Sequence, residues 1–235
     1  MDNYNNYHSS YNGGSLTSTV SSVMKRVYLK MTLGLIATAV TSLLAATSAG
    51  YMNFLIGHSW FMWVLVIAWF GIGIGLSGAI NKISSATASL MFYLFAVING
   101  LMLCTIFYAY SPAAIVKTFF ITAATFGAMT IYGYCTSKDL TKFGNFLFYA
   151  LIGLIIASVV NIFMRSSGFD WIISIIGVFI FVGLTAWDTQ QIKQMAMVAP
   201  EGMVSRLATI GALNLYLDFV NLFLFLLRIF GGNRD

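Results

Sequence analysis

Two acidic residues near the C-terminal end of the chain, Asp188 and Asp218, are the side chains best suited to chemistry. Each lies near or within a long apolar run, at 171–193 and 207–228. A carboxylate is costly in hydrocarbon, so such a residue normally faces the interior of a helix bundle and marks a polar path. We refer to Asp188 and Asp218 as the aspartate pair.

If the aspartate pair meets in a medium of low dielectric constant, both carboxyls cannot be ionised cheaply. They would then share one proton, and the titration would belong to the pair. Loss of that proton would add a repulsive charge at a buried contact between two helices. Such a change can switch helix packing, which is the physical basis of a pH-dependent gate.

The same two carboxylates could attract calcium as it passes. Calcium prefers six to eight oxygen ligands, and two acids cannot supply that number alone. We therefore expect weak transit of calcium past Asp188 and Asp218, and no tightly held metal or other resident cofactor.

Polar residues extend from the aspartate pair along one face of each apolar run. In the last run they recur every three or four residues, as expected for one helical face: Asn214, Asp218, Asn221, Phe225 and Arg228. The other positions are mainly Leu, Phe, Val, Ile and Tyr, which predicts a central helix whose polar face contacts other protein. The preceding run carries a weaker stripe: Ser174, Gly177, Phe181, Thr185 and Asp188. An inert hydrogen-bonded seam between the two helices remains the alternative.

The depths of the two acids raise a geometric question. Asp188 is five residues from Lys193, about 8 Å along a helix, whereas Asp218 is twelve residues from Arg206, about 18 Å. The depths match only if the sixth helix continues through Met197 or if the two helices tilt differently. Otherwise Asp188 lies at the cytoplasmic interface.

The composition indicates that lipid is the solvent for this chain. Of its 235 residues, 59% are hydrophobic and 8% are charged, whereas about 25% are charged in soluble domains. Continuous apolar runs such as 61–76 exclude a transmembrane β-barrel, whose strands alternate apolar and polar residues. The predicted fold is an all-α polytopic membrane protein, embedded in a lipid bilayer.

Seven spans of bilayer length are predicted, at 31–50, 59–80, 86–109, 113–135, 144–164, 171–194 and 207–228. Together they form a transmembrane domain over 25–235. Residues 1–22 are rich in Tyr, Asn, Ser, Gly and Thr, so we expect a disordered tail over 1–24. We expect a monomer.

The placement of basic residues predicts a cytoplasmic N-terminus. Eight basic residues then lie inside: Lys25, Arg26, Lys30, Lys82, Lys138, Lys142, Lys193 and Arg206. Four lie outside: Lys117, Arg165, Arg228 and Arg234. This excess fits the positive-inside rule and places the C-terminus outside, although the loss of one span would bring it inside. No helix carries a basic stripe, so nucleic acid is not an expected partner.

Other motifs favour structural roles over catalysis. Gly73, Gly75 and Gly78 match a dinucleotide fingerprint, but they lie within an apolar run without the required strand and turn. Gly71 and Gly75 have the spacing of a helix-packing motif. The two histidines, His8 and His58, form no metal motif or serine triad, and the last span lacks the lysine of a retinal protein. We do not expect an enzyme.

Three segments resemble the Bax inhibitor-1 (transmembrane BAX inhibitor motif) family. They are GLTAWDTQQIK at 183–193, ALNLYLDFVNLFLFLLRIFG at 212–231 and TSKDLTKFG at 136–144. The resemblance covers residues 25–235. It implies seven helices, the last surrounded by the other six, and a pH-regulated calcium path.

The resemblance also implies roles for individual residues. The family's pH-sensing aspartates match Asp188 and Asp218, with Asn214, Asn221, Arg228 and Thr185 as candidate pathway or supporting residues. Some members have an arginine near the inner end of the second helix, where this chain has Asn81 and Lys82. Lys82 could replace it only as a point charge, without the two-pronged hydrogen bonding of arginine.

Two functions follow as hypotheses. The first is a calcium leak channel or transporter, regulated by protons through the aspartate pair, in a bacterial cytoplasmic membrane. The second is a regulator that binds and modulates other membrane proteins; the resemblance links eukaryotic family members to suppression of cell death and some bacterial members to control of membrane proteases. In that case the acids would be structural, and the N-terminal tail could be a recognition segment.

Overall fold

The computed structural model describes residues 2–232, with side chains for 18–200 and 202–232. In chain order the elements are α1 (Asp2–Thr47), α2 (Ala49–Gly57), α3 (Trp60–Ala79), α4 (Ser85–Leu103), α5 (Ile106–Ala109), α6 (Pro112–Cys135), α7 (Thr141–Met164), α8 (Ser167–Val198), the 3-10 turn η1 (Glu201–Met203) and α9 (Val204–Phe230). Seven helical segments are long and apolar enough to cross a membrane, and no strand occurs in 2–232. The predicted all-α fold with seven spans is confirmed.

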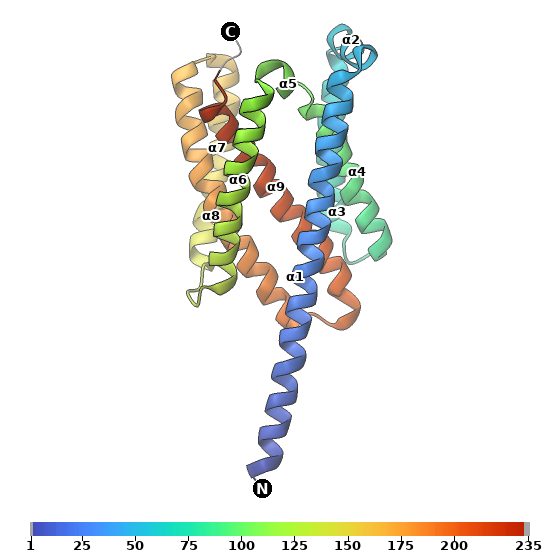
Figure 1. The fold of residues 1–235 in the computed structure, drawn as a ribbon, viewed down its shortest axis with the longest axis vertical. Helices are drawn as coiled ribbons and strands as arrows, with labels where there is room; N and C mark the ends of the chain where they lie inside the picture. Colours follow the sequence, from blue (N-terminus) through green and yellow to red (C-terminus); the bar gives the residue numbers. More distant parts are fainter. Residues whose placement is uncertain (1, 233–235) are drawn as a thin grey trace.

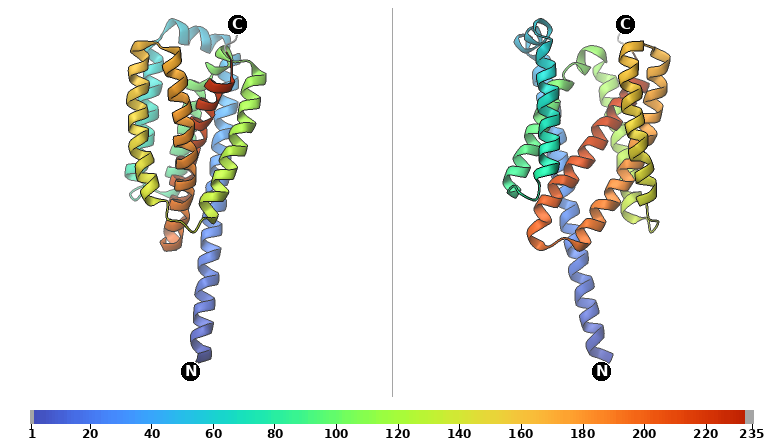
Figure 2. Two further views of the ribbon diagram at one scale, coloured as in Figure 1. Left: turned by 90° about the vertical axis from the view of Figure 1, so that its left-hand side faces the viewer. Right: turned by 180° about the vertical axis from the view of Figure 1, so that it is seen from behind.

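The spans form one elongated bundle with the two chain termini at opposite ends (Figure 1). The short helix α2 lies across the bundle at the same end as the C-terminus (Figure 2, left). An odd number of crossings requires this separation of the termini. The predicted cytoplasmic N-terminus therefore corresponds to an external C-terminus.

The first helix begins earlier than the sequence pattern indicated. α1 is helical from Asp2, and Val20, Val23 and Met24 are buried in the core. The structure therefore differs from a disordered tail over 1–24, at least over 20–24. The polar composition before residue 22 hid these three apolar side chains, which are spaced as one helical face.

Serine residues begin several helices. Ser84, Ser111 and Ser166 each accept a hydrogen bond from the backbone N–H three residues later, which satisfies a donor that the first helical turn leaves unpaired. Pro112 follows Ser111 at the start of α6, where its missing N–H costs nothing. These caps fix three of the helix boundaries that hydropathy alone leaves uncertain.

Helix α9 is the central helix of the bundle. It packs against α1, α4, α6 and α8, while α3 packs on α4 and α7 packs on α8. Its Leu213, Tyr216, Leu222 and Leu227 are almost completely buried. Large apolar side chains of the outer helices are instead exposed, as expected where lipid is the surrounding solvent.

Glycine permits close helix packing at specific points. A Cβ on Gly100 of α4 would lie 2.6 Å from the carbonyl oxygen of Thr38 in α1, so only glycine allows this approach. In α3, a Cβ on Gly73 would meet Phe95, whereas one on Gly71 would meet nothing within 4 Å. The G-x-G-x-x-G sequence therefore lies inside a helix, and Gly73 rather than Gly71 makes the close contact with α4.

Candidate functional site

The aspartate pair lies at the contact between α8 and α9. The two carboxyls are within hydrogen-bonding range, and each is the other's electrostatic partner. Asp218 is only 4% exposed, and no hydrogen-bond donor of the described residues reaches its Oδ2. A proton held between the carboxyls would supply that donor.

The length of α8 resolves the question of depth. α8 continues to Val198, so Asp188 lies roughly 15 Å from its C-terminal end, and Asp218 lies roughly 21 Å from the start of α9. The sixth helix thus runs past Met197, which was one of the two conditions for the acids to meet. α8 and α9 also cross the bundle obliquely (Figure 1).

A corner formed by α6 and α7 holds the segment of α8 that carries Asp188. The backbone of Ala186 packs directly on Gly133, and the Trp187 ring packs directly on Gly144. The Gln190 side chain accepts a hydrogen bond from the Leu140 N–H and donates one to the Lys138 carbonyl, both at 2.8 Å. The segments 136–144 and 183–193 therefore form one packed unit beside the pair.

On the face of α9 away from the aspartate pair, a chain of hydrogen bonds through Tyr216 joins α9 to α1 and α4. The Asn99 amide donates to the Tyr216 hydroxyl at 2.7 Å, and that hydroxyl lies 2.6 Å from the Thr38 hydroxyl. Thr38 in turn donates to the Ala96 carbonyl. Because the Thr38 proton is used there, Tyr216 is the donor to Thr38. This chain ties α9 to α1 and α4 close to Asp218.

A cavity of about 720 Å³ reaches the aspartate pair. It lies between α3, α7, α8 and α9, and its polar lining consists of Ser158, Asp188, Asn214, Asp218 and Asn221, with Trp187 beside them. The remaining lining is apolar and aromatic. The Asn221 amide nitrogen donates to the Leu217 carbonyl at 2.8 Å, so the side-chain oxygen is the group that Asn221 can offer to the cavity.

The other candidate residues are placed differently. The Thr185 hydroxyl is buried and donates to the Phe181 carbonyl of its own helix, and Thr185 does not line the cavity. Lys82 is exposed in the turn after α3, away from the cavity lining, so it does not take the position of an arginine beside the pair. Nearby, Arg206 donates to the Asn81 carbonyl at 3.4 Å.

Arg228 lies at the outer surface rather than in the cavity. Its guanidinium pairs with Asp170 at 3.4 Å and lies over the Phe225 ring, 5.5 Å from the ring centre. Phe225 stacks on Phe181 with ring centres 5.8 Å apart, and its ring occupies the space that a Cβ on Gly177 would need. Phe181 and Phe225 also line the cavity.

Lys30 is a cation near the inner end of the bundle that the sequence reading did not single out as a site. Its ammonium donates to the hydroxyls of Ser89 and Thr209, which join α1 to α4 and α9. A lysine at the start of an apolar run looked like a basic collar at the membrane surface. Only the three-dimensional arrangement reveals that hydroxyl groups surround it.

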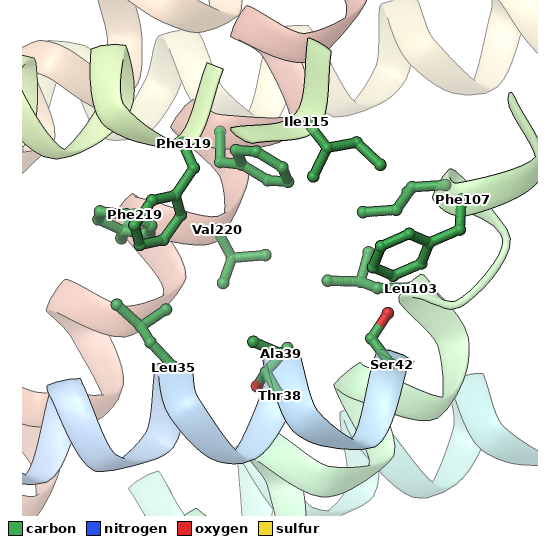
Figure 3. A pocket seen from close by; sticks show the side chains of 12 residues that line it. Leu35, Thr38, Ala39, Ser42, Leu103, Phe107, Ile115, Phe119, Phe219 and Val220 are labelled. Atoms are coloured by element: carbon green, nitrogen blue, oxygen red, sulfur yellow. The ribbon is translucent and has the colours of Figure 1, made fainter. Parts of the chain in front are cut away.

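A second, smaller cavity lies on the other side of α9. Its volume is about 110 Å³, and Figure 3 shows Leu35, Phe119, Phe219 and Val220 among the apolar side chains around it. Its hydroxyl groups come from Thr38 and Ser42, and none of the residues that line it is charged. This cavity has no group that titrates in the physiological range.

The described residues contain no group of three or more His, Cys, Asp or Glu side chains that could hold a metal ion. The aspartate pair and the amide oxygens of Asn214 and Asn221 are the oxygens gathered at the base of the larger cavity. Calcium usually takes six to eight oxygen ligands, more than these four side chains supply as single-oxygen ligands.

Comparison with known proteins identifies relatives across nearly the whole chain. Residues 20–235 match the family described as inhibitor of apoptosis-promoting Bax1. The chain is 46% identical to the inner membrane protein YbhL of Escherichia coli K12 over 214 residues, covering 90% of this chain and 92% of YbhL. It is 42% identical to an uncharacterized protein of Borreliella burgdorferi, with the same coverage of both chains. An uncharacterized membrane protein of Streptococcus pyogenes is 41% identical over 157 residues, 67% of this chain and 68% of that protein.

Proposed function

The chain belongs to the Bax inhibitor-1 family of membrane proteins, and from that premise we propose that it is a pH-regulated calcium leak channel or transporter. The gate in this proposal is the aspartate pair. The observation that carries it is the meeting of the buried Asp218 carboxyl with the half-buried Asp188 carboxyl in a cavity of the bundle. Because YbhL is an inner membrane protein, we place this chain in a bacterial cytoplasmic membrane.

The proposed gate uses the α8–α9 contact. With one shared proton, the pair carries a single negative charge and the two helices pack closely. When that proton is lost, two like charges face each other in a medium of low dielectric constant, and their repulsion favours separation of α8 from α9. Calcium leak should therefore increase as pH rises through the titration of the pair.

The ion path in this proposal runs past the polar face of α9. Asn214, Asp218 and Asn221 line the cavity one or two turns apart. The stacked rings of Phe181 and Phe225 also line the cavity, and in this proposal they move aside in the open state. Few oxygens surround the pair, which suits passage of calcium better than storage.

Calcium efflux from liposomes tests this proposal. Asp218→Asn replaces one carboxyl with a neutral group of the same shape, and we expect efflux to stay at its low level when the pH is raised. Asp170→Asn is the matched control because Asp170 is an acid of the same helix pair at the exposed outer end. Asp170→Asn should behave as the wild-type protein does, and the proposal is wrong if Asp218→Asn also keeps the wild-type efflux and pH response.

A regulatory role is the second candidate, and the inner tip of the α8–α9 hairpin favours it. Met195, Met197 and Val198 are exposed there, and Val198 is 82% exposed. Methionine-rich surfaces adapt to varied protein partners. In this case calcium efflux would be incidental, and polar substitution of the three side chains would remove a co-purifying membrane protein while leaving efflux unchanged.

Deletion of residues 1–17, which spares the buried Val20, tests whether the N-terminal segment recognises such a partner. The deletion should remove the co-purifying protein and leave calcium efflux unchanged.

A further inference from the structure

The cavity that reaches the aspartate pair is lined on two sides by membrane-spanning helices whose own outer surfaces are exposed. α3 and α7 form its two flanks, and α9 is visible between them when the bundle is seen from behind (Figure 2, right). Side chains of these flanks line the cavity and are also exposed: Phe70, Phe148, Ile155, Val159 and Ile162. Both helices are long and apolar enough to cross a membrane, so a mouth between their exposed side chains would face hydrocarbon.

The lining defines the chemistry of a ligand that could enter from this side. The walls are almost entirely apolar or aromatic, so the body of the ligand must be apolar. The base holds two carboxyls, and apart from a proton shared within the pair no donor of the described residues reaches the buried Oδ2 of Asp218. The head of the ligand must therefore donate hydrogen bonds and carry positive charge, because the base remains negative even with one shared proton.

We propose that this cavity is a membrane-facing binding site for protonated amphiphilic amines, with the aspartate pair as counter-ion. A primary ammonium has three donors and no acceptor, which complements carboxylate and amide oxygens. A volume of about 720 Å³ lies within the range of sites that bury most of a drug-sized molecule. The site shares the aspartate pair with the proposed calcium path, but amine binding does not require calcium transport.

Entry from the membrane side suits an amine better than a hydrated calcium ion. Calcium would lose most of its water on entry through an apolar mouth and would find few oxygens in exchange. An amphiphilic amine leaves its chain against the walls, where burial of apolar surface is favourable, and brings only its ammonium to the pair. The lateral mouth thus selects for a ligand already dissolved in the membrane.

Binding can be measured with a primary alkylamine that carries a fluorophore at the far end of its chain. The protein is placed in nanodiscs of zwitterionic lipid, so that the amine is not drawn to a charged membrane surface. We expect the wild-type protein to bind the amine saturably. The affinity of Asp218→Asn for the amine should be lower by roughly tenfold or more, as for loss of a hydrogen bond to a charged group. The alcohol analogue of the probe, which lacks the charge, should bind the wild-type protein no better than it binds Asp218→Asn.

A matched pair on α7 tests the lateral mouth. Val159 lines the cavity and is 49% exposed, whereas its neighbour Val160 is 43% exposed and does not line it. Val159→Trp should block binding, and Val160→Trp and Asp170→Asn should not. Both tryptophan variants alter a membrane-facing surface, so neither should disturb folding, which the elution volume in size-exclusion chromatography checks.

Two outcomes would overturn this proposal. Either the amine binds Asp218→Asn and Val159→Trp as it binds the wild-type protein, or the alcohol analogue binds the wild-type protein as tightly as the amine does. Calcium efflux is measured in parallel without amine. Amine binding without pH-regulated efflux would contradict the proposed channel alone, and efflux without amine binding would contradict the proposed amine site alone.

Discussion

At the scale of residues, the sequence identified the two acids and their polar stripe but not the groups that position them. The spacing of Asn214, Asp218 and Asn221 predicted one helical face, and all three line one cavity. The same spacing included Arg228, which instead pairs with Asp170 at the surface. Periodicity gives the direction of a side chain, but it does not tell where along a helix the protein interior ends.

The role of Tyr216 in positioning α9 depends on partners that are far away in the sequence. Tyr216→Phe should lower the free energy of unfolding by about 1–3 kcal/mol, because the buried Asn99 amide then loses its acceptor. The midpoint of thermal unfolding in detergent micelles reports this loss. Tyr149→Phe is the control, since Tyr149 is 72% exposed, and its midpoint should match the wild-type value. Equal midpoints for both variants would contradict the positioning role.

At the scale of elements, hydropathy located all seven spans but not their ends. The first span was placed too late because polar residues precede Val20, and the sixth was placed too short because Asp188 and Lys193 resembled a membrane boundary. Because α8 continues to Val198, Asp188 lies well inside its helix, where it meets Asp218. Contacts such as Gly133 with Ala186 decide this geometry, and they join residues about fifty positions apart.

Glycine at position 133 should be necessary for the α6–α8 contact. Gly133→Ala places a methyl group against the Ala186 backbone, which cannot move aside as a side chain would. We expect destabilisation of about 1–3 kcal/mol, as for overpacked cores. Gly127→Ala in the same helix meets nothing within 4 Å, and alanine favours helix, so its unfolding midpoint should be unchanged or slightly higher. Midpoints in the reverse order would show that the contact is not tight.

The turn between α6 and α7 should weaken at acidic pH. The Thr141 hydroxyl and then the Thr141 backbone N–H, which is 2.9 Å from Oδ1, lower the pKa of the exposed Asp139 carboxyl by hydrogen bonding to its ionised form. A lowered pKa means that the stabilisation is complete above the ordinary pKa of aspartate and is lost as pH falls through the lowered value.

Hydrogen exchange of residues 138–144 at two pH values measures this effect. After correction for the intrinsic pH dependence of exchange, protection should fall at the acidic pH in the wild-type protein. Asp139→Asn should show less protection at neutral pH and a smaller difference between the two conditions. If the wild-type protein and Asp139→Asn show equal protection from hydrogen exchange at both pH values, the Asp139 carboxylate does not stabilise this turn.

At the scale of the whole molecule, the sequence predicted a bundle with a central last helix, and α9 occupies that position. It did not predict the lateral mouth between α3 and α7, because an opening toward lipid is lined by the same apolar residues as a closed contact. In the proposed function and the proposed amine site, the same aspartate pair acts at the contact between α8 and α9.

Calcium efflux from liposomes, measured across a range of pH for the wild-type protein and Asp188→Asn, tests the central claim most directly. The account predicts that wild-type efflux rises as pH increases and the shared proton is lost. The Asp188→Asn variant lacks the second charge, so its efflux should remain low and independent of pH. A variant whose efflux rises with pH as the wild-type efflux does would show that the aspartate pair is not the gate.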